Sequence, residues 1–312
     1  MFILESMLFM TDLKNNKGKI KVLTNETKTL RIEEFDKEDI PGILDLSASV
    51  NWDYDEYEIG TVMSSGKIYG HKNAEGKIVS SAGIIPYENN LASIGMVIVN
   101  KDFRGLGLGK EATQKCLDFV SSDTSVMLIA TEEGKPLYEK LGFRVVDRVH
   151  KYLCDSYTAV KPKLLVNSGV SFNEFDERDF TEILNLDTAA FGDKRSNFLH
   201  NRINQSKQCL VVKDNTGTII GYGISILGPI NLILGPIVAP NVQTAVLLLD
   251  RLAFRHQGKL RIDVPSGNED LMLFLEQSGF KKVSNPPIMI TNSVKMPHRN
   301  NTLFGIAAQI FG

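Results

Sequence analysis

The chain carries the same pattern of apolar and polar positions twice. Leu30–Leu46 and Val170–Leu186, at an offset of 140, share seven identities in 17 positions, including an Asp before an amphipathic segment. A second pair, Leu137–Val146 and Phe274–Val283, matches at an offset of 137 and keeps a Gly-Phe step. Chance similarity between amphipathic segments is the alternative explanation. Two pairs of matching segments, in the same order and at nearly the same offset, favour two copies of one domain.

The first copy alternates between strand and helix patterns. Leu30 and Ile32 begin a short strand, and Asp36 is placed to cap the helix that follows. A hairpin comes next, with the turn NAEG between Lys67–His71 and Lys77–Ile85. The remaining predicted elements are the strand Ser93–Val99, the helix Gly107–Val120, the strand Val126–Thr131, the helix Lys135–Leu141 and the strand Val145–Tyr152.

The second copy repeats this order, with Asp176 at its first helix start. Its predicted elements are the hairpin strands Cys209–Lys213 and Thr218–Ile226, the strand Ile230–Val238, the helix Val242–Phe254, the strand Leu260–Val264, the helix Asn268–Ser278 and the strand Ile288–Thr291. An antiparallel start followed by strand–helix–strand units predicts an α/β fold, α+β in character, with a mixed sheet in each copy. We therefore expect a tail over 1–28, a first domain over 29–155, a linker over 156–168 and a second domain over 169–312, whose final segment packs on the body.

Charge and cysteine content narrow the class of protein. The 312 residues include 35 Lys and Arg against 37 Asp and Glu, a formal charge of −2, which gives no electrostatic reason to bind nucleic acid or an anionic membrane. Cys116, Cys154 and Cys209 fit no zinc or disulfide pattern, so we expect no metal site and a reducing, cytoplasmic compartment. The apolar start MFILESMLFM lacks the features of a signal peptide, and Ile224–Val238 is too short and too broken by proline to span a bilayer.

The stretch that points to chemistry runs from an apolar strand ending at Val99, through Arg104–Gly109 (RGLGLG), into an amphipathic helix. Glycine lacks a Cβ, so the backbone can approach a phosphate closely, and the helix N-terminus favours negative charge. The spacing fits neither the dinucleotide fingerprint nor the Walker A motif. A pyrophosphate is therefore a suitable guest, and a glycine-rich turn without a ligand is the alternative.

Val99 and Arg104–Gly109, with a strand before and a helix after, resemble the acetyl-CoA signature of the GNAT N-acetyltransferase family. Leu137–Phe143 resembles that family's second conserved segment. The resemblance implies two tandem GNAT-like acyl-CoA N-acyltransferase domains, the second degenerate, with acetyl-CoA as the cofactor. It also implies Tyr138 as the general acid that protonates the departing thiolate, with packing between helix and sheet as the alternative. The residues it assigns to acetyl-CoA are Val97, Ile98, Val99, Arg104, Gly105, Leu106, Gly107, Leu108, Gly109 and Tyr138.

One position departs from the family pattern. Many members carry an Asn seven residues before the Tyr, where this chain has Thr131, so the contact of that Asn with CoA is not carried over. A protonated amine must lose a proton before it attacks, and the candidates for the general base are Glu132, Glu133 and Asp53. For each of them the alternative is a solvated loop carboxylate.

The acceptor side and the second copy carry weaker signals. Trp52 and Asp193 are candidates to contact the acceptor, with a core role and a helix cap as their alternatives. His71 is expected on the surface of a strand. In the second copy, Pro236–Thr244 has no glycine or Arg after the strand, and Leu275 stands where the first copy has Tyr138, so we expect no CoA binding or catalysis there.

The resemblance therefore predicts an N-acetyltransferase. It would move an acetyl group from acetyl-CoA to a primary amine of a small molecule or an amino acid, by direct transfer in a ternary complex. The alternative is a non-catalytic acyl-CoA-binding regulatory or scaffold protein. Tyr138 favours the enzyme.

Overall fold

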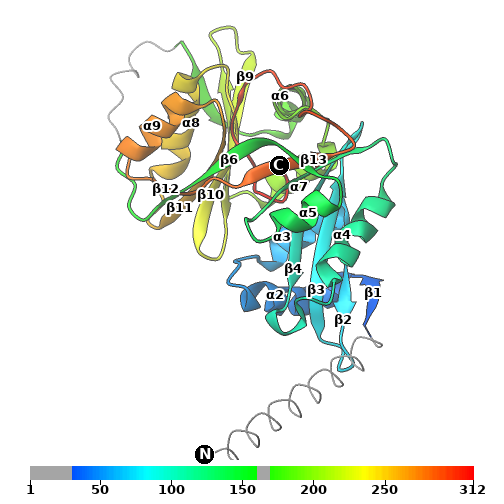
Figure 1. The fold of residues 1–312 in the computed structure, drawn as a ribbon. Coiled ribbons are helices and arrows are strands. Elements are labelled where there is room, and N and C mark those ends of the chain that lie inside the picture. Colours follow the sequence, from blue (N-terminus) through cyan, green and yellow to red (C-terminus); the bar gives the residue numbers. More distant parts are fainter. Residues whose placement is uncertain (1–29, 160–168) are drawn as a thin grey trace, which may run out of the picture.

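The computed structural model describes residues 30–159 and 169–312, which form two repeats of one fold (Figure 1). The strands of the first repeat are β1 (Arg31–Glu34), β2 (Lys67–Lys72), β3 (Ile78–Pro86), β4 (Leu91–Val99), β5 (Ser125–Ile129) and β6 (Arg144–Cys154). Its helices are α2 (Ile40–Ser49), α3 (Glu56–Ser65), α4 (Leu108–Phe119) and α5 (Lys135–Lys140), with short 3₁₀ turns at η1 (Lys37–Asp39) and η2 (Lys101–Phe103).

The second repeat has the same order of elements. Its strands are β7 (Ser171–Glu174), β8 (Gln208–Lys213), β9 (Ile219–Leu227), β10 (Asn231–Val238), β11 (Lys259–Pro265), β12 (Lys281–Ser284), β13 (Pro287–Thr291) and β14 (Leu303–Gly305). Its helices are η4 (Glu177–Asp179), α6 (Phe180–Phe191), α7 (Ser196–Gln205), α8 (Val242–Ala253) and α9 (Glu269–Gln277). The strands and helices that were predicted with both ends are confirmed, with ends within two residues, whereas α3, α7 and β12 were not predicted.

Both repeats begin their first helix with the same capping box. The Asp36 carboxylate accepts from the Glu38 amide at 2.8 Å, while the Asp36 amide donates to Asp39 at 3.2 Å. Asp176 and Asp179 form the same box in the second repeat. These reciprocal bonds satisfy amides that a helix start leaves free, and they confirm the predicted start at Asp36.

The two repeats exchange strands within one continuous sheet. The strand order is β1-β2-β3-β4-β5-β13-β6-β11-β10-β9-β8-β7, so β13 of the second repeat lies between β5 and β6 of the first. The second half of β6 pairs with β11, and Figure 1 shows β6 (green) running across to the second repeat. Each repeat thus receives a strand from the other, and pairing crosses the predicted boundary between 29–155 and 169–312. The predicted tail over 1–28 and most of the predicted linker lie outside the described residues.

Helices cover both faces of this sheet. In the first repeat, α4 packs on one face of β2, β3 and β4, and α2 and α3 pack on the other. The second repeat places α8 and α6 on opposite faces in the same way. The core beneath α2 and α3 continues beneath α6 and α7, so one apolar cluster joins the two repeats.

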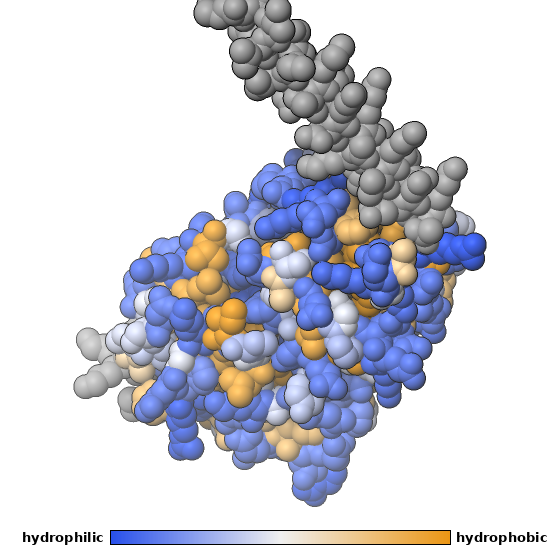
Figure 2. All heavy atoms as spheres, turned by 90° about the horizontal axis from the view of Figure 1, so that it is seen from below, coloured by the Kyte–Doolittle hydropathy of each residue, from blue (hydrophilic) through white to orange (hydrophobic). Residues whose placement is uncertain are grey.

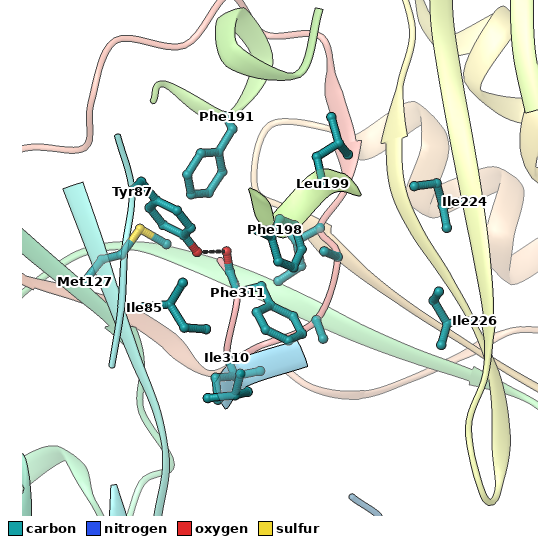
Figure 3. Packing of buried hydrophobic residues seen from close by; sticks show 14 of the residues in the cluster. Ile85, Tyr87, Met127, Phe191, Phe198, Leu199, Ile224, Ile226, Ile310 and Phe311 are labelled. Atoms are coloured by element: carbon teal, nitrogen blue, oxygen red, sulfur yellow. Dashed lines mark hydrogen bonds between the residues drawn. The ribbon is translucent and has the colours of Figure 1, made fainter. Parts of the chain in front are cut away.

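The end of the chain is buried at this junction, as the sequence predicts for the final segment. β14 pairs antiparallel with β10, and Phe311 beyond it is fully buried among Phe191 and Phe198 (Figure 3). The Tyr87 hydroxyl donates to the Phe311 carbonyl at 2.7 Å, and the Ser93 hydroxyl donates to the Ile310 carbonyl at 2.8 Å. These bonds tie the last residues of the second repeat to the β3–β4 turn and to strand β4 of the first.

His71 corrects one expectation. It was expected on the surface of a strand, but it is fully buried, because α4 covers that face of β2. Its Nδ1 lies 2.7 Å from Ser80 Oγ, and its Nε2 lies 3.3 Å from a carboxylate oxygen of Glu111 on α4. The ring therefore joins β3 to the covering helix.

The face of the molecule seen from below (Figure 2) is mostly hydrophilic. Seen from below, apolar residues form patches among the hydrophilic ones that cover most of this face (Figure 2). Among residues 30–159 and 169–312, no helix has the length and apolar character that crossing a membrane requires.

Candidate active site

The loop between β4 and α4 presents its backbone outward. Gly105 and Gly107 both have φ of +83°, the left-handed region that favours glycine. A Cβ on either residue would meet no atom within 4 Å, so both border open space. Arg104 is exposed beside them, whereas Leu108 and Gly109 are buried where the helix begins. The glycines therefore let the chain turn sharply into α4 with little side-chain cover.

The amides of this loop have no hydrogen-bond partner in the part of the chain that the structure describes. Across the described residues, no hydrogen bond uses the backbone N–H of any of the six residues Gly105–Lys110. The next amide, that of Glu111, donates to the Gly107 carbonyl at 3.0 Å, and α4 has no side-chain cap. Free amides at the positive end of a helix dipole form a cradle for an anion. A pyrophosphate group fits this donor set.

Beside the loop, β4 separates from β5. The two strands pair in parallel only over Leu91–Ile94 of β4. Beyond that point Met96 has φ of +53°, the register against β3 shifts, and Ser81 Oγ holds the bulge by donating to the Met96 carbonyl at 2.7 Å. Within the described chain, Ile98 and Val99 pair with β3, and no strand pairs with Val97–Val99 on the side of β5, so that backbone edge is open. An extended amide-containing chain could pair with this edge.

The second repeat has the same bulge, but its own chain fills the corresponding gap. β10 and β11 pair only over Asn231–Ile233, and the register of β10 against β9 shifts past Leu234. β14 then pairs with β10 at Ile237 and Val238. The helix start is closed as well, because the Asn241 side chain accepts from the Thr244 amide at 2.9 Å. Neither the open edge nor the free helix N-terminus of the first repeat recurs here.

Tyr138 lies on α5, next to the loop and the open edge. A Cβ on Gly109 would lie 3.2 Å from Val99 and 3.7 Å from Leu137, so the end of β4, the start of α4 and α5 converge at this point. The Tyr138 ring is buried and packs edge-on against Phe143, with 5.9 Å between centroids. Burial, and secondarily Cys116, raises the pKa of the Tyr138 phenol well above its usual range, and no bond within the described residues engages its hydroxyl. The phenol is neutral at physiological pH and holds a proton it can donate.

The acidic residues before α5 lie on the loop side. Thr131 Oγ1 accepts from the Gly134 amide at 3.1 Å and so helps to form the turn into α5. Glu132 and Glu133 are exposed, and Glu133 lies 3.6 Å from Arg104. Glu133 therefore flanks the glycine loop.

Asp53 and Trp52 lie in the loop between α2 and α3, on the other face of the sheet. Trp52 is 37% exposed and packs edge-on against Tyr54, with 6.0 Å between ring centroids. Burial raises the pKa of Tyr54, and among the groups acting on its phenol are Asp53 and Tyr138. The loop thus lies on the face of the sheet opposite α4, and Tyr54 within it lies in electrostatic range of Tyr138.

Sequence reasoning missed Tyr54 and two basic residues near this loop. The charge of Asp53 acts on both Lys151 on β6 and Arg261 on β11. The available signal was the presence of charged residues within two predicted strands, Lys151 in HKYLC and both Arg261 and Asp263 in LRIDV. Their meeting depends on the pairing of β6 with β11, which no local pattern shows.

Asp193 lies at the junction of the repeats. It is 3% exposed, and its carboxylate accepts from the backbone amides of Asn89, Asn90 and Leu91, at 2.8 to 3.0 Å, and from the Asn89 side chain at 2.7 Å. These bonds engage both carboxylate oxygens in holding the β3–β4 turn. Asp193 therefore holds the junction of the two repeats, and its carboxylate is occupied by these bonds.

Comparison with known proteins matches both repeats. Residues 56–152 and residues 183–305 each match a family described as an acetyltransferase (GNAT) domain. The chain is 38% identical over 277 residues to the Bacillus subtilis (strain 168) protein named "Uncharacterized N-acetyltransferase YitH", covering 88% of this chain and 96% of that one. This chain therefore belongs to the GNAT acetyltransferase family, whose members transfer acyl groups from acyl-CoA.

Solved structures show the same tandem fold. A putative acetyltransferase from Pyrococcus horikoshii superposes with a TM-score of 0.74 at 20% identity, over 91% of this chain and 96% of that one. A tandem GNAT protein from the clavulanic acid biosynthesis pathway superposes with a TM-score of 0.60 at 12% identity, over 85% and 99% of the two chains. The predicted family and the tandem mixed-sheet fold are confirmed.

Proposed function

We propose that this chain is an N-acetyltransferase that moves an acetyl group from acetyl-CoA to a primary amine, of a small molecule or an amino acid, in a ternary complex. One observation carries the proposal: the free amides of Gly105–Lys110 adjoin the open edge of Val97–Val99. The two features suit the two ends of an acyl-CoA arm, a charged pyrophosphate and an extended amide-containing chain.

The first repeat supplies donors along this path. The amides of Gly105–Lys110 would bind the pyrophosphate, with Arg104 beside them. The edge of Val97–Val99 would pair with the pantetheine arm and present one N–H to the thioester carbonyl. Bound acetyl-CoA supplies a thioester whose acyl carbon accepts the attacking amine.

Two side chains would move protons. Tyr138 would donate its phenolic proton to the departing thiolate, because a phenol is protonated at physiological pH and Tyr138 lies on α5 beside the end of β4. Asp53 would take the proton of the amine, directly or through water, since it lies in the loop that approaches from the opposite face. Glu132 and Glu133 suit that role less well, since both are exposed and Glu133 lies against Arg104.

The second repeat would bind no acetyl-CoA. β14 occupies the gap beside β10, Asn241 caps α8, and Leu275 is a fully buried side chain without a proton to give. We therefore expect one acetyl-CoA per chain. The three described cysteines are free and buried, which suits the reducing cytoplasm.

The test is amine-dependent release of thiol from acetyl-CoA, with the acetylated amine identified by mass spectrometry. Free amino acids, polyamines and aromatic amines form the panel of acceptors. Asp53→Asn should slow release at saturating acetyl-CoA, and Asp45→Asn, an exposed carboxylate on α2, is the matched control. Tight acetyl-CoA binding with no amine-dependent release would favour a non-catalytic acyl-CoA-binding protein instead.

A further inference from the structure

Two basic side chains meet where the repeats exchange strands. Lys151 on β6 stands directly opposite Asp263 on β11, and Arg261 lies two positions before Asp263, so all three side chains share one face of the sheet. Figure 1 shows the two strands side by side at the junction. Lys151 belongs to the first repeat and Arg261 to the second.

Arg261 keeps unused donors although it is largely buried. Its side chain is 12% exposed, and its Nε donates to Asp263 Oδ2 at 2.8 Å. Asp263 Oδ1 accepts from the Gln309 side chain at 2.8 Å, so both oxygens of Asp263 are engaged. In the part of the chain that the structure describes, no bond engages the two Nη nitrogens of Arg261. These nitrogens form the fork that matches a carboxylate.

The ammonium group of Lys151 also keeps unused hydrogen-bond donors among the described residues. No ion pair or hydrogen bond of the described residues engages its Nζ, even though Asp263 lies opposite. Burial lowers the pKa of Lys151, Arg261 lowers it further, and Asp263 and Asp53 oppose them. Two cations kept together with unused donors favour an anionic guest.

Asp53 adds the complementary charge. No bond within 30–159 and 169–312 engages its carboxylate, and it acts electrostatically on Lys151, Arg261 and Tyr54. Tyr138 acts on Tyr54 in turn, which connects the cluster to the active-site phenol. Free cationic donors and a free carboxylate together complement a ligand that carries both an anionic group and an ammonium group.

We infer that the acceptor is a small amino acid-like zwitterion whose carboxylate binds Lys151 and Arg261 and whose amine lies at Asp53. This inference rests on the proposed acyl transfer and narrows its acceptor class. It also gives the second repeat a direct part in binding, through Arg261, although that repeat lacks the features of a CoA site. Lys151 and Arg261 act here as specificity-determining residues.

The experiment compares amino acids with the amines formed by removing their carboxylate. The pairs are lysine and cadaverine, ornithine and putrescine, histidine and histamine, and tyrosine and tyramine. Each compound is titrated calorimetrically into the full chain saturated with CoA. The variants are Arg261→Gln and Lys151→Gln. The control is Lys259→Gln, because Lys259 lies on β11 with Arg261 but its side chain is 60% exposed.

We expect at least one amino acid to bind about tenfold or more tightly than its paired amine. Arg261→Gln and Lys151→Gln should each remove most of that difference by weakening the binding of the amino acid, while Lys259→Gln changes neither affinity. Two variants on different strands guard against a folding defect in one. Equal binding within every pair, or no amino acid binding at all, overturns the inference.

Acetyl-CoA is titrated in the same series to separate the two proposals. Normal acetyl-CoA binding without a carboxylate preference rejects the acceptor assignment alone. If the wild-type chain does not bind acetyl-CoA, the proposed function is contradicted, and the acceptor assignment fails with it.

Discussion

The backbone amide of Leu91 in the first repeat donates a 2.8 Å hydrogen bond to Oδ2 of Asp193 in the second. The same buried carboxylate accepts from the amides of Asn89 and Asn90, each at 3.0 Å. One side chain of the second repeat therefore holds the turn that leads into β4, the strand with the open edge. The stability of the candidate site depends on contacts between the repeats.

Asp193→Ala should destabilise the protein strongly. It leaves four backbone amides near the junction, those of Asn89, Asn90, Leu91 and Lys194, without their acceptor, and the expected loss in free energy of unfolding is about 3 kcal/mol. Chemical denaturation followed by circular dichroism measures it. Asp214→Ala is the control, because Asp214 accepts similar amide bonds within an exposed turn of the second repeat. Equal losses in the two variants would contradict a special role for Asp193.

Glu88 should make stability fall in acid. Its carboxylate accepts from the Ser196 amide at 2.6 Å and pairs with Lys194 at 3.0 Å. Burial raises the pKa of Glu88, but the bonds from Ser196 and Lys194 outweigh it, and the pKa lies below its ordinary value of 4.5. A lowered pKa in the folded state gives stability that is present above pH 4.5 and lost as the pH falls through the folded-state pKa.

The melting temperature of Glu88→Gln tests this expectation. The difference between wild type and variant should be full at pH 6 and should shrink as the pH falls below about 4.5. Glu75→Gln, in the β2–β3 turn, serves as the exposed control. A difference that stays constant from pH 6 to pH 3 would show that the cross-repeat bonds of Glu88 do not contribute through its charge.

Tyr138→Phe should lower kcat about 100-fold and leave the affinity for acetyl-CoA within about twofold, because the ring keeps its packing and only the proton donor is lost. Tyr152→Phe is the matched control, since Tyr152 is also buried but its hydroxyl donates to Glu276 at 3.3 Å. The wild-type kcat should not fall up to about pH 9.5, since burial keeps the Tyr138 phenol protonated. Parallel losses of kcat and acetyl-CoA affinity would instead identify Tyr138 as a packing residue.

Local sequence pattern predicts the elements well because strand and helix periods are local properties. It cannot predict the strand exchange, since the pattern of Val145–Tyr152 shows a strand without showing its partner. Local pattern alone does not distinguish between apolar strands of similar length as pairing partners. The partner is chosen by packing across the junction, where the final segment and β13 find their places.

The candidate site divides in the same way. Arg104–Gly109 form one contiguous motif, so the turn made by Gly105 and Gly107 can be predicted from the sequence. Lys151 and Arg261 lie more than 100 positions apart and meet only through the pairing of β6 with β11. His71 was misplaced for a related reason, because alternation within a strand does not show which face a distant helix will cover.

The most direct test of this account is the calorimetric stoichiometry of acetyl-CoA on the wild-type chain and on Gly107→Val. Gly76→Val is the matched control, because Gly76 has φ of +78° and equally open surroundings but lies in the β2–β3 turn. The account predicts one acetyl-CoA per chain, no binding to Gly107→Val and normal binding to Gly76→Val. Two acetyl-CoA per chain, or unchanged binding to Gly107→Val, would contradict it.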